Sequence, residues 1–160
     1  MSYYDLEQAG PTLKRWLMHA KARILYATAR INFTLSQSKD RKFILIGEKN
    51  GYQARDNAYH LFCYLYDSGR RDVFFVSRKK SADSSALSKF GGNIIRYNSL
   101  RHYVMLLQSR LLIINDGYTD VYPNLPGILY LTHEPFYYVE HGIIRYKKLY
   151  FNSSHYVGRI

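Results

Sequence analysis

Short apolar runs separated by polar segments fill the chain from residue 43 onward, and four of them predict strands. The predicted strands span residues 43–47, 73–76, 93–96 and 111–114. Short apolar runs bounded by turn residues are typical of strands that are buried on both faces. The spacing of apolar residues between them predicts helices at residues 54–66 and 84–90, and a third that begins at Ser99. Strands that alternate with helices predict a Rossmann-like α/β fold, a parallel sheet with helices on both faces.

The last third of the chain adds two further candidate strands. A loop rich in glycine and proline spans residues 117–127, and apolar runs follow at residues 128–131 and 136–139. The second run leads directly into His141 and Gly142. In open α/β sheets, ligands bind just outside the carboxyl ends of the strands. The loops that follow Ile46, Val76, Ile114 and Val139 are therefore where we expect a site.

The N-terminal segment has the pattern of a basic amphipathic helix. Its apolar positions recur every three or four residues, at Leu13, Trp16, Leu17, Ala20, Ile24, Ala27, Thr28 and Ile31. Cations surround this stripe, and no acidic residue lies between Glu7 and Asp40. Such a helix is typical of an anchor at an anionic membrane surface. The candidate membrane-binding residues are Lys14, Arg15, Trp16, Lys21 and Arg23. A helix whose stripe packs on this domain, or on a second one, is equally compatible with the pattern.

Length and charge define the domain organisation and the class of partner. The 160 residues are 47% hydrophobic, which suits one compact domain at residues 42–160, preceded by a helical segment at residues 1–36. The formal charge of +11 indicates an anionic partner: nucleic acid, a membrane surface or a phosphate-rich substrate. Because the sequence has no RNP-like, KH-like or helix-turn-helix signature, nucleic acid is the least favoured of the three.

Cysteine usage and hydropathy indicate where the protein works. Cys63 is the single cysteine, so no disulfide or cysteine metal cluster can form within one chain, and a reducing cytoplasm fits. No apolar run reaches the ~20 residues needed to span a bilayer. The start of the sequence does not resemble a signal peptide. We therefore expect a cytoplasmic protein with at most a peripheral membrane contact.

Two loops are candidates for ligand binding. Residues 47–51 form a glycine-flanked turn that can present backbone N–H groups and a helix start to a phosphate. Its spacing matches neither a dinucleotide fingerprint nor a Walker loop. From spacing alone, a helix start that carries Arg55 and Asp56 as solvated or mutually paired charges is favoured. Asp116 follows a strand but belongs to no Asp-x-Asp motif, and an Asn-Asp-Gly turn suffices to explain it.

His141 is the most informative single residue. It lies between a predicted strand end and Gly142. An imidazole with a reference pKa near ~6.5 can take a proton from a hydroxyl group at neutral pH. From its position alone, both a structural and a catalytic role are open.

Several of these segments together resemble the CDP-glycerol:poly(glycerophosphate) glycerophosphotransferase family. The segments are Gly47-x-x-x-Gly51, residues 54–59, Tyr64-Leu65, Gly117-Tyr118-x-Asp120 and, above all, the block at residues 139–148 with its His-Gly pair, trailing basic pair and following aromatic residues. The similarity runs from about Phe43 to Phe151. The chain departs from the family pattern at Glu140, where glutamine is usual, and at Asn115-Asp116, where many members have a histidine.

The resemblance implies a GT-B-type architecture, in which two Rossmann-like domains face each other across a cleft. The present chain looks like the N-terminal, acceptor-side domain. It ends at Ile160, before the C-terminal donor domain that binds CDP-glycerol in the family, so the isolated chain is expected to be inactive.

The resemblance also implies a reaction and its residues. Members transfer glycerol phosphate from CDP-glycerol to a hydroxyl of a lipid-linked teichoic-acid, cell-wall or capsule polymer and release CMP, with no cofactor or metal expected here. His141 would be the general base. The protein would act at the cytoplasmic face of the cell membrane. The candidate residues for substrate and phosphate binding are Arg55, Asp56, Asn57, Gly142, Arg145, Lys147 and Lys148. The alternatives are half of a GT-B glycosyltransferase that uses a nucleotide sugar, and a non-catalytic basic module that binds an anionic polymer.

Overall fold

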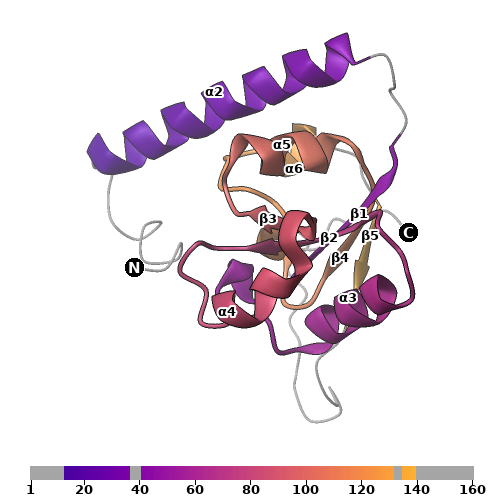
Figure 1. Cartoon of the computed structure of the whole chain (residues 1–160). Coiled ribbons are helices and arrows are strands. Elements are labelled where there is room, and N and C mark those ends of the chain that lie inside the picture. The colour runs from indigo at the N-terminus through magenta and orange to yellow at the C-terminus, as the bar shows by residue number, and fades with distance from the viewer. Residues whose placement is uncertain (1–12, 37–40, 132–134, 140–160) are drawn as a thin grey trace, which may run out of the picture.

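The computed structural model describes residues 13–36, 41–131 and 135–139, and its centre is a five-stranded parallel sheet (Figure 1). The strands are β1 (Phe43–Gly47), β2 (Val73–Ser77), β3 (Ile94–Arg96), β4 (Ser109–Ile114) and β5 (Phe136–Tyr138). Their order across the sheet is β3-β2-β1-β4-β5, and every neighbouring pair is parallel. The predicted Rossmann-like α/β fold is confirmed.

Helices cover both faces of the sheet (Figure 1). On one face lie α3 (Asn57–Asp67) and α4 (Ser84–Leu87), where Phe62 packs on Phe75 of β2. On the other lie α5 (Leu100–Leu107) and, outside it, α2 (Leu13–Leu35). Successive residues of β1 to β4 alternate between these two cores. Continuous apolar runs are therefore what the strands require.

Three predicted elements differ from the structure. Residues 128–131 form a short helix, α6 (Ile128–Leu131), and not a strand, because a four-residue apolar run has no periodicity that separates the two. The helix predicted from residue 54 begins at Asn57. The helix predicted at residues 84–90 ends as α4 at Leu87 and continues as a 3-10 helix, η2 (Ser88–Asn93), in which Gly91 has a φ of 49°.

The long helix α2 packs on α5 through two alanines, a leucine and two aromatic residues. These are Ala22, Leu25, Tyr26, Ala29 and Phe33. Ala29 is fully buried, and the ring of Tyr26 meets that of Tyr103 edge-on, with 6.5 Å between centroids. The positions recur at helical spacing and define one side of the helix.

The predicted apolar stripe of α2 lies on the opposite side and is exposed. Trp16 is 66% exposed, Ile24 66% and Ile31 60%. At 3.6 residues per turn, these positions point away from Ala22 and Ala29. The helix does pack on this domain, but the predicted stripe takes no part in that contact. The stripe is therefore not the side through which α2 packs on this domain, and its membrane contact stays a prediction.

Candidate functional site

The order of the strands reverses between β1 and β4, and the loops after these two strands meet at the carboxyl edge of the sheet. Gly47 ends β1 directly beside Ile114, which ends β4. The first loop contains the 3-10 helix η1 (Lys49–Gly51), and the second contains η3 (Tyr118–Asp120). Such a reversal is the usual ligand-binding position in open α/β sheets.

Close backbone approach shapes this edge. A Cβ atom on Gly47 would collide with the carbonyl group of Asp120. Lys49, Asn50 and Gly51 then have φ values of 47°, 53° and 75°. Three successive left-handed residues are rare outside glycine, and they turn the chain sharply away from the strand. The turn brings the Lys49 side chain back toward the second loop, as its contacts show.

The buried side chain of Glu48 binds the backbone N–H groups at the start of α3. Its side chain is fully buried, and its carboxylate accepts N–H groups from Arg55 (2.6 Å), Asp56 (2.9 Å) and Tyr59 (2.9 Å). These N–H groups are the ones that a helix start offers to an anion. The anion bound here is the protein's own carboxylate. The helix starts at Asn57 because Asp56 is extended and caps it, its side chain accepting the N–H of Asn57 at 2.9 Å.

Asp120 joins the two loops. Its carboxylate accepts N–H groups from Asn50 (2.8 Å), Asn115 (3.0 Å), Asp116 (2.7 Å) and Gly117 (3.2 Å). Burial raises the pKa of Asp120 above its usual value, and the four N–H donors oppose that effect. The carboxylate therefore fixes the relative position of the loops.

Four polar side chains meet above this framework. The ammonium of Lys49 lies 2.6 Å from Asp116 Oδ1 and 3.7 Å from Asp56 Oδ2. Asn115 Nδ2 donates to the same Asp56 oxygen at 3.2 Å. We call Lys49, Asp56, Asn115 and Asp116 the switch-point cluster. Asn115 Oδ1 is buried and has no hydrogen-bond partner among the described residues.

The charges of the cluster support one another. Burial alone lowers the pKa of Lys49, but the hydrogen bond and charge of Asp116 outweigh it and raise that pKa. Burial acts to raise the pKa of Asp116, yet Lys49 holds it below its usual value. At neutral pH the pair is therefore an ammonium and a carboxylate. The cluster can bind hydroxyl groups through carboxylate and amide oxygens and a phosphate oxygen through Lys49.

The predicted site residues fall in several places. Asp56 belongs to the cluster, whereas Arg55 is exposed and donates from Nε to Asp83 at 3.0 Å. Asn57 is an exposed residue at the first position of α3. Along α2, the side chains of Trp16, Lys21 and Arg23 are exposed, and Lys14 and Arg15 belong to its first turn. His141, Gly142, Arg145, Lys147 and Lys148 lie outside the described residues.

The described chain nevertheless leads to the cluster. Tyr138 of β5 pairs with Ile114, and the N–H of Val139 donates to the Ile114 carbonyl at 2.8 Å. Val139 is thus beside the strand end from which Asn115 and Asp116 extend, and His141 is the second residue after it.

The sequence interpretation missed Lys49 and Asn115 and left Asp116 as a turn residue. All three follow predicted strand ends, so that signal was present. The missing information was the adjacency of β1 and β4, because residues 47 and 114 are far apart in the chain. Among residues 13–36, 41–131 and 135–139, no three His, Cys, Asp or Glu side chains are grouped as a metal site.

The fold and cluster define a class, a Rossmann-like α/β protein with a polar ligand site at the reversal of its strand order. Comparison with protein-family models adds the family. Residues 28–156 match the CDP-glycerol:poly(glycerophosphate) glycerophosphotransferase model, and the chain belongs to this family. Membership supports a transferase function of the glycerophosphotransferase type.

Two other comparisons gave no relatives, since neither the curated proteins nor the solved structures contain a match. Within the part of the chain that the structure describes, no helix is both long enough and apolar enough to cross a membrane.

Proposed function

We propose that this chain is the acceptor-side part of an enzyme that transfers glycerol phosphate from CDP-glycerol to a hydroxyl of a lipid-linked cell-wall or capsule polymer. The observation that carries the proposal is the family match over residues 28–156. The switch-point cluster supports it, because it presents groups that bind hydroxyls at the edge where this fold binds ligands. Residues 42–160 would form the acceptor domain, and a donor domain of the GT-B type would supply CDP-glycerol.

The proposed reaction is a phosphoryl-centred substitution. The acceptor oxygen forms a bond to the phosphorus that bears the glycerol, and the bond from that phosphorus to the CMP oxygen breaks. His141 takes the proton of the acceptor hydroxyl as the new bond forms. Arg145, Lys147 and Lys148, with Gly142 beside the histidine, are proposed to bind the phosphate whose charge increases.

The switch-point cluster is proposed to hold the acceptor end. The free lone pairs of Asn115 Oδ1 suit the O–H donor of a terminal glycerol unit. Lys49 and Asp116 hold each other in place and leave little conformational freedom to lose on binding. Positioning of this kind supplies a large part of the rate in phosphoryl transfer.

We also propose that α2 rests on the anionic cytoplasmic surface of the cell membrane. Its exposed side combines Trp16, Ile24 and Ile31 with the flanking cations Lys21 and Arg23, and Lys14 and Arg15 precede them in the sequence. A lipid-linked acceptor would be presented at that surface. The observation in support is that α2 binds its own domain through the opposite side.

The test is release of CMP from CDP-glycerol in the presence of a membrane-bound glycerol phosphate acceptor. The chain is assayed alone and joined to a donor domain of the family, and turnover is expected only in the joined form. His141→Ala should lower kcat by at least about a hundredfold, which is the usual contribution of a general base. His60→Ala, an exposed histidine of α3, is the matched control.

Each alternative gives a distinct result. Undiminished turnover by His141→Ala would remove the base assignment. Turnover with a nucleotide sugar in place of CDP-glycerol would identify a glycosyltransferase. Binding of an anionic polymer by both forms, with no turnover of any donor, would identify a non-catalytic module.

A further inference from the structure

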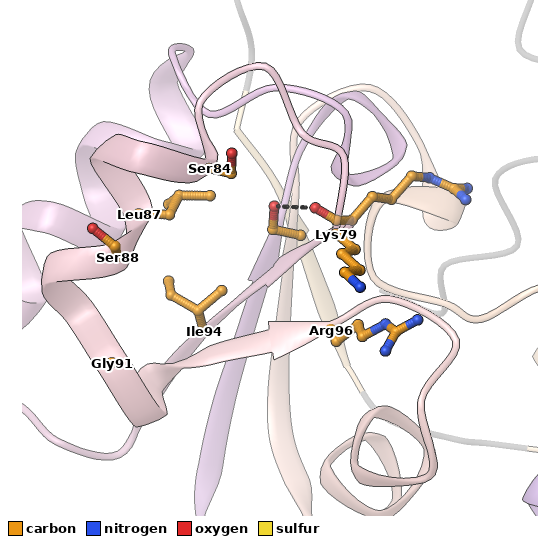
Figure 2. Close-up of a pocket in the computed structure, with 9 residues that line it drawn as sticks. Lys79, Ser84, Leu87, Ser88, Gly91, Ile94 and Arg96 are labelled. Carbon is orange, nitrogen blue, oxygen red and sulfur yellow. Dashed lines mark hydrogen bonds between the residues drawn. The ribbon is translucent and has the colours of Figure 1, made fainter.

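A pocket of about 380 Å³ opens at the carboxyl ends of β2 and β3, two strands away from β4 and its loop (Figure 2). One wall comes from the end of β2, the two residues after it and β3, and the other comes from α4 and η2. The volume falls within the range of roughly 300–1,000 Å³ that is usual for small-ligand sites. None of the residues that line the pocket belongs to the predicted catalytic segment around His141.

The lining of this pocket is cationic and contains no acid. Arg78, Lys79 and Arg96 line it, and in the described part of the chain none of the three forms an ion pair. Figure 2 shows Lys79 and Arg96 on the same side of the pocket. The nearby Asp83 is occupied by Arg55 and by the N–H of Ala54. A pocket lined by cations without acidic partners favours an anionic ligand.

Arg78 is held in place before any ligand binds. Its guanidinium lies between two aromatic rings, 4.3 Å from the centroid of Tyr52 and 4.1 Å from that of Tyr97. Its Nε donates to the carbonyl of Asn50 at 2.8 Å. An arginine fixed by stacking loses little freedom on binding and presents its remaining donors in a defined plane.

The rest of the pocket suits carbon and hydroxyl groups. Leu87 and Ile94 supply an apolar surface, and Ser84 and Ser88 lie on the helical wall beside them (Figure 2). A site for a bare anion has no need of such a surface. A phosphate attached to a short polyol uses the cations, the hydroxyls and the apolar surface together.

The pocket is coupled to the switch-point cluster through one loop. The backbone N–H of Arg78 donates to the Gly51 carbonyl at 2.8 Å, and its side chain binds Asn50. Lys49 of the cluster precedes these residues in η1. A flexible chain of repeated units can therefore have its end at Lys49 and an inner phosphate in the pocket.

We infer that this pocket binds an inner glycerol phosphate unit of the acceptor polymer, while the terminal unit occupies the switch-point cluster. The inference rests on the proposed function for the identity of the polymer. The pocket then acts as a subsite that favours long acceptors over short ones. Its three cations position the polymer and do not touch the reacting phosphate.

The test compares two double variants with the same change in charge. Lys79→Gln with Arg96→Gln removes two exposed lining cations. Lys80→Gln with Lys89→Gln removes two exposed lysines of the same segment that do not line the pocket. Binding of a soluble glycerol phosphate oligomer, of inorganic phosphate and of phosphatidylglycerol vesicles to the full chain is measured by calorimetry and co-sedimentation.

The pocket variant is expected to lose at least about tenfold in affinity for the oligomer, because two charge-assisted contacts are removed, and the control variant should stay within twofold. Equal losses in both variants would overturn the inference in favour of a general surface charge. If inorganic phosphate binds as tightly as the oligomer, the inference that the pocket recognises the glycerol portion of the unit is overturned. A loss confined to vesicles would assign the pocket to a lipid headgroup and also overturn it.

A kinetic measurement separates this inference from the proposed function. In the form that releases CMP, the pocket variant should raise KM for a long acceptor by about tenfold and leave kcat and the KM for a single glycerol phosphate unit unchanged. An unchanged KM for the long acceptor would reject the pocket while the transferase stands. Lost oligomer binding without any CMP release would keep the pocket and reject the transferase.

Discussion

Glu48 is the residue on which the geometry of the β1 loop depends. Its buried carboxylate satisfies three backbone N–H groups at the entry to α3, two through Oε1 and one through Oε2. Buried donors that lose their acceptor cost about 1–3 kcal/mol each. The sequence alone indicated only a turn at this position.

Replacement of Glu48 should destabilise the fold in two graded steps. Glu48→Gln keeps the shape and one acceptor oxygen but sets an amide NH₂ against one N–H group, so the free energy of unfolding should fall by about 1–2 kcal/mol. Glu48→Ala leaves all three N–H groups unpaired and should lower it by about 3 kcal/mol or more. Urea denaturation with an unchanged m-value measures both.

Asp67→Asn is the control for this pair, because that carboxylate is exposed at the end of α3. It should change stability by less than about 0.5 kcal/mol. A Glu48→Ala protein as stable as the wild type would show that the three hydrogen bonds do not hold the loop.

At the scale of elements, the sequence predicted the strands well and the surfaces of α2 only in part. Strands β1, β2, β4 and β5 are apolar runs bounded by turn residues, and Ser99 caps α5 by accepting the N–H of His102 at 3.2 Å. The packed side of α2 was missed because it includes Ala22 and Ala29, whose small size allows close approach but gives a weak hydrophobic signal.

The exposed stripe of α2 provides a membrane test that leaves the fold intact. Trp16→Ser, Ile24→Ser and Ile31→Ser together change side chains that are at least 60% exposed. Each should remove roughly 1 kcal/mol of interfacial binding, so affinity for anionic vesicles should fall by about a hundredfold, with an unchanged Tm. Deletion of residues 1–36 is a poorer test, because it also uncovers the side of α5 that α2 covers.

The control for the stripe is Tyr64→Ser, on α3 at the other face of the sheet, where the side chain is 69% exposed. It should bind anionic vesicles like the wild type. Equal binding by the triple variant would assign the stripe to a protein contact and reject the membrane surface.

At the scale of the whole molecule, the sequence predicted a parallel sheet but not its strand order. Alternation of strands and helices is a local signal. The contact of β1 with β4, in contrast, joins two segments that β2 and β3 separate along the chain. The cluster of Lys49, Asp56, Asn115 and Asp116 exists only because of that contact. The resemblance to the family predicted roles for Asp56 and His141, and the role of His141 stays a prediction. It assigned none to Lys49, Asn115 or Asp116.

His102 links distant parts of the fold and makes its stability depend on pH. The ring is fully buried; Nδ1 accepts the N–H of Asn98 at 3.1 Å, so Nε2 carries the proton and donates to the Val121 carbonyl at 2.8 Å. A second proton would have to bind Nδ1, where it would point at the N–H donor of Asn98. Burial lowers the pKa of His102 to about 4, and the charge of Arg78 adds to this effect while the Val121 carbonyl opposes it.

The sign of the pH effect follows from this lowered pKa. Between pH ~6.5 and about 4 the unfolded chain binds a proton at this position that the folded chain does not bind. The contribution of neutral His102 to the free energy of unfolding should therefore be fully present above pH ~6.5. That free energy should fall by about 3 kcal/mol as the pH drops to about 4. His102→Gln should be less stable at pH 7 but lose less stability on acidification, whereas His60→Gln should keep the wild-type slope. Should the variant fail to fold, the imidazole resonances of the wild type give the pKa directly, and a value near ~6.5 would contradict the linkage.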